Sequence, residues 1–203
     1  SLTSLKASLR DHIEKALVFL PFHRKNEGER KKSLHLDQLL DEGRALSSIP
    51  HSTLDFIFMS YRYWNYFLKF QKEFNDKNLK PEEMNDLWAL GFSALLTRDQ
   101  TPAELIVNDC VELAKKKFGP HTAGITNAFL RKTGREKARL NKWIAEHPET
   151  LLGPVLQERW KKEPKLCFDM GTKLLLRPAS GMECFNEKAE FLRLPQEEFL
   201  KRI

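Results

Sequence analysis

The chain has 203 residues, enough to bury one good hydrophobic core or one domain and part of a second. Hydrophobic residues make up 41% and charged residues 31%, as in ordinary globular proteins, and no apolar run is long enough to span a bilayer. The formal net charge of +6 permits attraction to nucleic acid without requiring it. The three cysteines lie far apart, so the sequence predicts no disulfide framework and fits a reducing cytoplasm.

Helical periodicity begins at the N-terminus. Over residues 2–20, apolar side chains recur at three- and four-residue spacing, and Pro21 then ends the pattern. A polar stretch over residues 26–32 predicts a loop, after which Ser33 can cap a short helix that ends near Leu46. We therefore expect two helices before residue 50.

Residues 54–74 are predicted to form a central buried helix, because aromatic residues occupy nearly all of its sides. A platform for stacking nucleic acid bases is the alternative, although aromatic residues at helical spacing more commonly form a core. The next helix is expected to begin at Pro81 and to pack through its leucines against the helices that follow.

A pair of helices is predicted over residues 101–135. Thr101 can cap a helix that begins at Pro102, and Glu104 can complete a capping box. Gly119 is expected to end this helix in the left-handed conformation. A second helix is expected over residues 121–133 and should end at Gly134. We expect it to bury Ile125, Ala128 and Phe129.

Residues of this pair match a known signature. The matching residues are, in chain order, Pro102, Asn108, Glu112, Leu113, Ala114, Lys115, Gly119, Asn127, Ala128, Leu130 and Arg131. They resemble the NusB-like family. The helix before the pair is also similar to the corresponding helix of that family, although Gly91 and Ser93 stand where the family usually has alanine and glutamate. That family comprises the bacterial antitermination factor NusB and the N-terminal domain of Sun/RsmB-type ribosomal RNA 5-methylcytosine methyltransferases.

The resemblance implies an all-α NusB-like helical bundle over residues 1–146. Within it, Asn108 and Asn127 are of interest, because asparagine is unfavourable inside a helix unless its amide finds partners. We expect the two amides to be buried and to share a polar contact across the helix pair. The alternative is that one of them faces an RNA base or a partner's backbone.

Beyond residue 146 we expect a linker helix and a small α/β, β-rich connector over residues 147–203. The segment 151–160, which ends in Arg159 and Trp160, is similar to the linker of Sun-type methyltransferases. Two short apolar runs, 166–170 and 173–178, predict a hairpin, and residues 185–194 predict a further strand.

Basic residues gather at the ends of the predicted helix pair. On an arbitrary protein such clusters usually reflect the preference of lysine and arginine for helix C-termini and solvated loops. The NusB-like resemblance favours RNA contact instead. The predicted RNA-binding residues are Lys115, Lys116, Lys117, Arg131, Lys132, Arg135, Lys137 and Arg139, and a second basic cluster comprises Arg24, Lys25, Arg30, Lys31 and Lys32.

No catalytic residue and no metal ligand is assigned. The six histidines show no metal-ligand spacing, and none of the three cysteines follows a proline, as one of the two catalytic cysteines of a Sun-type enzyme usually does. A glycine-rich loop for S-adenosylmethionine is also missing from the sequence. We therefore expect no cofactor in this chain, and S-adenosylmethionine only if a catalytic domain follows it.

Three functions remain open at this point. The first is the RNA-binding N-terminal part of a Sun/RsmB-like ribosomal RNA methyltransferase. The second is a free-standing antitermination factor that works with a ribosomal protein on nascent RNA. The third is a helical protein-interaction module that has lost RNA binding, which the divergence around His51–Thr53 favours.

Overall fold

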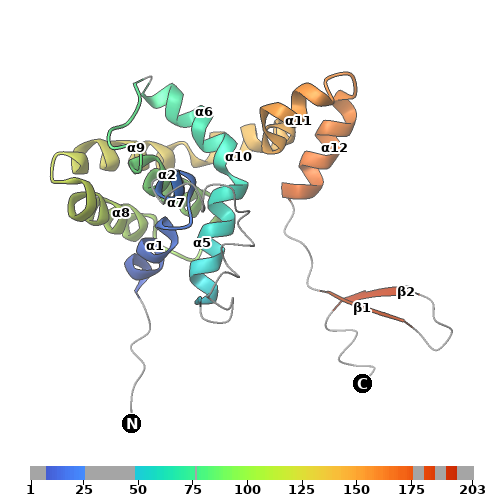
Figure 1. The fold of residues 1–203 in the computed structure, drawn as a ribbon, viewed down its shortest axis with the longest axis horizontal. Helices are drawn as coiled ribbons and strands as arrows, with labels where there is room; N and C mark the ends of the chain where they lie inside the picture. The colour runs from blue at the N-terminus through green and yellow to red at the C-terminus, as the bar shows by residue number, and fades with distance from the viewer. Residues whose placement is uncertain (1–7, 26–48, 76, 176–180, 186–190, 196–203) are drawn as a thin grey trace, which may run out of the picture.

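The computed structural model describes residues 8–25, 49–75, 77–175, 181–185 and 191–195, and Figure 1 shows their arrangement. The helix predicted after Ser33 and the basic residues Arg30, Lys31 and Lys32 lie outside the described residues. The elements are α1 (Leu9–Leu17), α2 (Pro21–Lys25), α5 (His51–Arg62), α6 (Trp64–Phe74), α7 (Met84–Thr97), α8 (Ala103–Phe118), α9 (Thr122–Arg135), α10 (Lys137–Glu146), the 3-10 helix η2 (Pro148–Leu152), α11 (Gly153–Arg159), α12 (Pro164–Leu175), β1 (Gly181–Phe185) and β2 (Phe191–Pro195).

The central helix of the bundle is α7. Every residue from Met84 to Leu96 is buried, and α7 contacts α1, α2, α5, α6, α8, α9 and α10. Its sequence carries no lysine or arginine, and its single carboxylate, Asp86, accepts hydrogen bonds from the backbone N–H groups of Phe22 and His23 in place of water. The prediction that residues 54–74 form one central helix was wrong. That segment is two helices that break at Tyr63, and α5 and α6 each bury only part of their surface.

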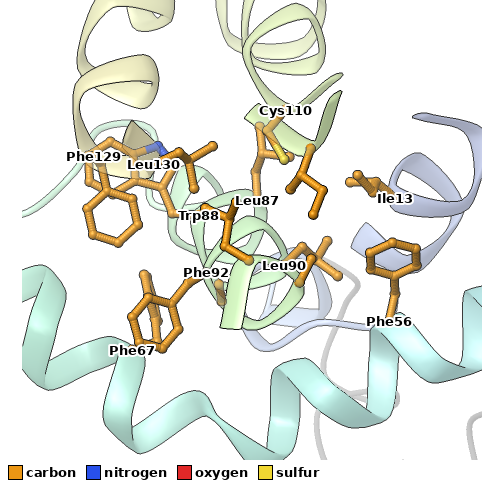
Figure 2. Packing of buried hydrophobic residues seen from close by; sticks show 14 of the residues in the cluster. Ile13, Phe56, Phe67, Leu87, Trp88, Leu90, Phe92, Cys110, Phe129 and Leu130 are labelled. Carbon is orange, nitrogen blue, oxygen red and sulfur yellow. The ribbon is translucent and has the colours of Figure 1, made fainter. Parts of the chain in front are cut away.

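The core is aromatic around Phe129 of α9. Its ring stacks on Trp88 of α7 with ring centroids 4.4 Å apart and planes 10° apart, and Phe74 of α6 meets it edge-on at 5.4 Å. Figure 2 shows Phe129, Trp88, Phe92 and Phe67 converging from three helices. Stacked and edge-on pairs of this kind stabilise a core beyond their buried area.

The two positions where α7 departs from the resembled pattern are explained by packing. A Cβ on Gly91 would lie 2.6 Å from Cδ2 of Leu130 and 3.2 Å from Sγ of Cys110, so glycine lets α8 and α9 approach α7 closely. Ser93 is buried, and its hydroxyl lies 3.2 Å from that of Ser60 on α5. A glutamate there would bury a charge without a partner.

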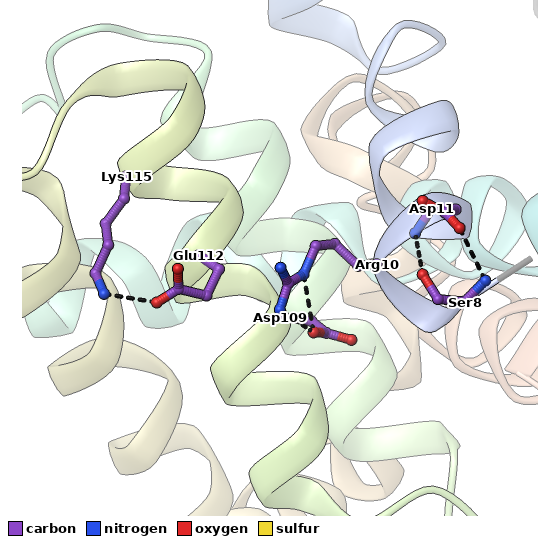
Figure 3. A network of polar contacts seen from close by, with 6 residues as sticks. All are labelled: Ser8, Arg10, Asp11, Asp109, Glu112 and Lys115. Atoms are coloured by element: carbon purple, nitrogen blue, oxygen red, sulfur yellow. Dashed lines mark hydrogen bonds and ion pairs between the residues drawn. The ribbon is translucent and has the colours of Figure 1, made fainter.

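Capping occurs at a different helix from the one predicted. Ser8 caps α1 in a capping box with Asp11, as Figure 3 shows. In contrast, α8 begins after Pro102 and has no side-chain cap. Gly119 ends α8 as predicted, but its φ of 100° and ψ of 159° lie outside the left-handed helical region, in a conformation that only glycine adopts readily. Gly134 does not end α9, which continues to Arg135.

The hairpin predicted over residues 166–178 was wrong, because residues 164–175 form α12. Cys167 and Gly171, four residues apart, are the buried positions of α12 and face η2. Short apolar runs are ambiguous between strand and helix from periodicity alone, which explains the error. The described residues after 147 are mostly helical and do not support a β-rich extension. β1 and β2 form an antiparallel pair in which Gly181 lies opposite Pro195 and Phe185 opposite Phe191.

The predicted domain boundary after residue 146 falls between α10 and η2 and stays a prediction. η2 also contacts α6, since the Tyr66 hydroxyl donates a hydrogen bond of 3.0 Å to the carbonyl of His147 and the Asn65 amide donates one of 3.3 Å to that of Leu151. None of the described helices has both the length and the apolar character that crossing a bilayer would need.

We predict that Gly171→Ala opens the contact between α12 and η2. The added Cβ would lie 2.1 Å from the carbonyl oxygen of Pro148, so the two backbones must separate. Overpacking of this kind costs about 1–3 kcal/mol, which hydrogen exchange of the α12 amides measures as a lower free energy of opening.

Gly134→Ala in α9 is the control for that substitution. A Cβ there meets nothing within 4 Å, so the helix should gain stability by roughly 0.5–1 kcal/mol. Unchanged exchange of α12 in the Gly171→Ala protein would contradict the close approach.

Candidate nucleic-acid interface

Most of the predicted RNA-binding residues come together where α9 ends and α10 begins. Glu136 is both the C-terminal cap residue of α9 and the N-terminal cap residue of α10, with φ −95° and ψ 8°, so the two helices join with a change of direction but no loop. We call this region the α9–α10 basic surface. It comprises Arg131, Lys132, Arg135, Lys137 and Arg139.

Few carboxylates neutralise the α9–α10 basic surface. Glu136 contacts both Arg139 and Lys132, the latter with its oxygen 3.9 Å from Nζ. Asp99 lies 2.6 Å from Nζ of Lys137, and this contact lowers the pKa of the Asp99 carboxyl. Arg135 makes no ion pair with any residue that the structure describes. Two carboxylates therefore face five cations.

Aromatic rings of α6 lie beneath two of these cations. Nζ of Lys132 is 5.7 Å from the ring centroid of Phe74 and 5.9 Å from that of Phe70, and the guanidinium of Arg139 is also 5.9 Å from Phe70. Cation–π contacts hold such side chains over the bundle instead of leaving them free in solvent. Phe70 is only 3% exposed, so the ring itself is part of the core and not a platform for stacked bases.

The three lysines that end α8 form a separate group. Lys115 pairs with Glu112 at 2.6 Å, whereas Lys116 and Lys117 lie 3.0 and 3.2 Å from Glu14 of α1 and lower the pKa of that carboxyl. Because a short turn joins α8 to α9, this group lies at the start of α9, about 20 Å of helix from its basic end. The predicted set is therefore two groups, and the group on α8 is largely engaged with carboxylates.

The predicted contact between Asn108 and Asn127 is not formed. Asn108 is exposed, and the half-buried Asn127 accepts a 3.0 Å hydrogen bond from Nε of Arg131 on its own helix. The buried polar contact that joins the central helix to α9 is instead a 3.0 Å hydrogen bond from Nε1 of Trp88 to Oγ1 of Thr126. Thr126 precedes Asn127 by one residue, which turns its side chain to the buried face of α9.

A scan against protein-family models matches residues 61–135 to the NusB family. The matched segment contains α6, α7, α8 and α9, including Pro102 and Gly119 of the predicted signature. A search of curated proteins and a search of solved structures both found no significant match.

Within the NusB domain, the signature residues have structural roles at the ends of α8. Pro102 precedes its first residue, and Gly119 ends it. The family match ends at residue 135, so it includes Arg131, Lys132 and Arg135. Lys137 and Arg139 lie just beyond its end. The α9–α10 basic surface thus combines residues of the NusB domain with residues of the helix that follows it.

The structure adds a buried ionisable group that the sequence analysis missed. Asp86 of α7 is fully buried and accepts hydrogen bonds from the backbone N–H groups of Phe22 and His23, and its Oδ2 lies 2.7 Å from Nδ1 of His23. Burial raises the pKa of this carboxyl despite these partners. The hydrogen bonds of Asp86 anchor α2 to the NusB domain. In the sequence, the signal for this buried group was an aspartate inside an otherwise apolar helix.

A buried thiol lies in the core of the NusB domain. Cys110 has no exposed surface, and burial raises the pKa of its thiol to about 12, so it stays protonated and unreactive near neutral pH. The part of the chain that the structure describes contains no group of three or more histidine, cysteine, aspartate or glutamate residues placed to hold a metal ion.

We predict that Thr126→Val destabilises the NusB domain. Valine keeps the volume but leaves the indole N–H of Trp88 buried without an acceptor, which costs about 1–3 kcal/mol of unfolding free energy. Urea denaturation followed by circular dichroism measures this loss.

Asn127→Ala serves as the comparison, because its amide contacts only Arg131 near the surface. Its unfolding free energy should stay within about 0.5 kcal/mol of the parent value. Equal losses for the two variants would contradict the assignment of Thr126 as the polar link.

Proposed function

We propose that this chain binds RNA through the α9–α10 basic surface. The observation that carries the proposal is the excess of cations over carboxylates on two consecutive helix ends. Phosphate contacts by lysine and arginine supply most of the affinity in non-specific binding of nucleic acid. The NusB family match over residues 61–135 is consistent with an RNA-binding module.

The geometry of the surface supports phosphate contact over base stacking. Lys132 and Arg139 are held over buried rings, so their charged ends are oriented before RNA arrives. Arg131 and Arg135 are exposed, and a guanidinium can grip a phosphate through two parallel hydrogen bonds. The lysines of α8 are assigned a smaller share, because ion pairs to Glu14 and Glu112 already compete for them.

We further propose that the module handles substrate for a Sun/RsmB-like ribosomal RNA 5-methylcytosine methyltransferase. The similarity of residues 151–160 to the linker of such enzymes supports this assignment over an antitermination factor. Arg159 ends α11, and the half-buried Trp160 follows it, so the linker-like segment is folded onto the module. The three cysteines lie far apart in the sequence and predict no disulfide framework, which suits a protein of the reducing cytoplasm.

We predict that replacing Arg131, Lys132 and Arg135 together with glutamine weakens RNA binding. Each lost phosphate contact removes roughly 0.7 from the slope of log affinity against log salt for single strands, so the slope should fall by about two. Fluorescence anisotropy with a ribosomal RNA fragment at several salt concentrations measures both quantities.

The matched control replaces Lys162, Lys165 and Lys173 with glutamine. These exposed lysines lie on or next to α12, and their loss changes the net charge by the same amount. The control should keep nearly the parent salt slope. If both triple variants lose affinity equally, binding follows net charge and the α9–α10 basic surface is not the site.

We also predict that this chain alone does not bind S-adenosylmethionine or transfer a methyl group. Methyl transfer requires a nucleophile and a bound cofactor held within reaction distance. Isothermal titration with S-adenosylmethionine should give only heat of dilution, and ribosomal RNA should gain no radiolabelled methyl group. Saturable binding at micromolar concentration would overturn the assignment of this chain as non-catalytic.

A further inference from the structure

A cleft of about 340 Å³ opens between the end of α10, η2, α11 and α12, outside the segment that matches the NusB family. Figure 1 shows α11 and α12 in orange beside the bundle. This volume is within the range of small-ligand sites. The side chains that line the cleft are those of Glu146, Glu149, Gln157, Trp160, Lys161, Pro164, Cys167 and Phe168.

The walls of the cleft are held in place. α12 lies directly against η2, where Gly171 leaves no room for a side chain beside the backbone of Pro148. Cys167 is 5% exposed, and its thiol donates a hydrogen bond of 3.7 Å to the carbonyl of Trp160. The Tyr66 hydroxyl fixes the start of η2 through the carbonyl of His147. The cleft therefore exists before any ligand binds.

The cleft combines negative charge with aromatic surface. No hydrogen bond or ion pair joins the Glu149 carboxylate to any described residue, and Glu146 has only a distant contact, 3.8 Å from Nζ of Lys142. The cation that lines the cleft, Lys161, is paired with Glu158 at 2.5 Å. Phe168 is 43% exposed, although it is a large apolar residue. A ligand with positive charge and a flat apolar face would satisfy both features.

We propose that this cleft binds an arginine side chain of a partner protein. A guanidinium is planar, stacks on aromatic rings and forms two parallel hydrogen bonds with a carboxylate, whereas a lysine ammonium lacks the flat face. The two carboxylates repel RNA phosphates, so the cleft is separate from the α9–α10 basic surface. The arginine stacks on Trp160 and Phe168 and pairs with Glu149.

The test uses the full chain with ¹⁵N-labelled tryptophan. The chain contains four tryptophans, and the Trp160→Phe variant identifies the indole signal of Trp160 in the NMR spectrum. The probe is the blocked tripeptide acetyl-Gly-Arg-Gly-amide. Its matched control has citrulline, which keeps the shape but loses the charge. We expect the arginine peptide to shift the Trp160 signal saturably and the citrulline peptide to bind at least about fivefold more weakly.

Two protein variants locate the charge that matters. Glu149→Gln should raise the Kd of the arginine peptide about fivefold, because it removes one charge-assisted contact without changing the shape of the cleft. Glu104→Gln removes an equal charge from an exposed site on α8 and should leave the Kd unchanged. Unaltered signals from the other tryptophans establish that each variant is folded.

Four results would overturn the proposal. One is the absence of a saturable shift of the Trp160 signal, and another is an equal effect of Glu149→Gln and Glu104→Gln. The third is a larger shift with guanosine monophosphate than with the arginine peptide, which would assign the cleft to a nucleobase. A Trp160 signal that changes with protein concentration alone, together with a dimer in sedimentation, would place a second copy of this chain in the cleft instead.

Discussion

The burial of α7 on all sides is the constraint on which the rest of the structure depends. Because no face of this helix meets water from Met84 to Leu96, every neighbouring helix must present an apolar stripe to it. Gly91 lets α8 and α9 approach α7 closely, and Trp88 is the largest fully buried side chain and supplies the indole N–H that Thr126 accepts. The hydroxyls of Ser60 and Ser93 lie 3.2 Å apart, so these two buried polar groups pair with each other.

The position of the α9–α10 basic surface follows from that constraint. Phe129 fixes the rotation of α9 by stacking on Trp88, so the residues on the opposite face, including Arg131 and Arg135, are turned outward. α10 then starts at once after Glu136, which continues the line of cations onto a second helix. The same core residues that stabilise the bundle therefore set the spacing of the charges proposed to meet RNA.

Two surfaces of opposite charge character result from one chain. On the α9–α10 basic surface, the buried ring of Phe70 lies beneath Lys132 and Arg139. This surface suits an extended polyanion. The cleft at α12 is concave, acidic and aromatic, and it suits a single cationic side chain. Close approach at Gly171 places α12 directly against η2, so the cleft is formed by packed helices. A protein that handles RNA beside a protein partner could use the two surfaces at once.

The sequence by itself determined the helical class, the NusB-like pair over residues 101–135 and the presence of its basic ends, because helix periodicity, a proline start and a glycine stop are local signals. Only the tertiary structure decided which helix is central, since α6 and α7 are both rich in apolar residues and burial depends on neighbours. It also decided that Thr126 and not Asn127 faces the core, because one residue shifts the direction by about 100° on a helix. Ion pairs between distant segments, such as Glu14 with Lys116, divided the basic residues into engaged and available groups, and no local pattern encodes such pairs.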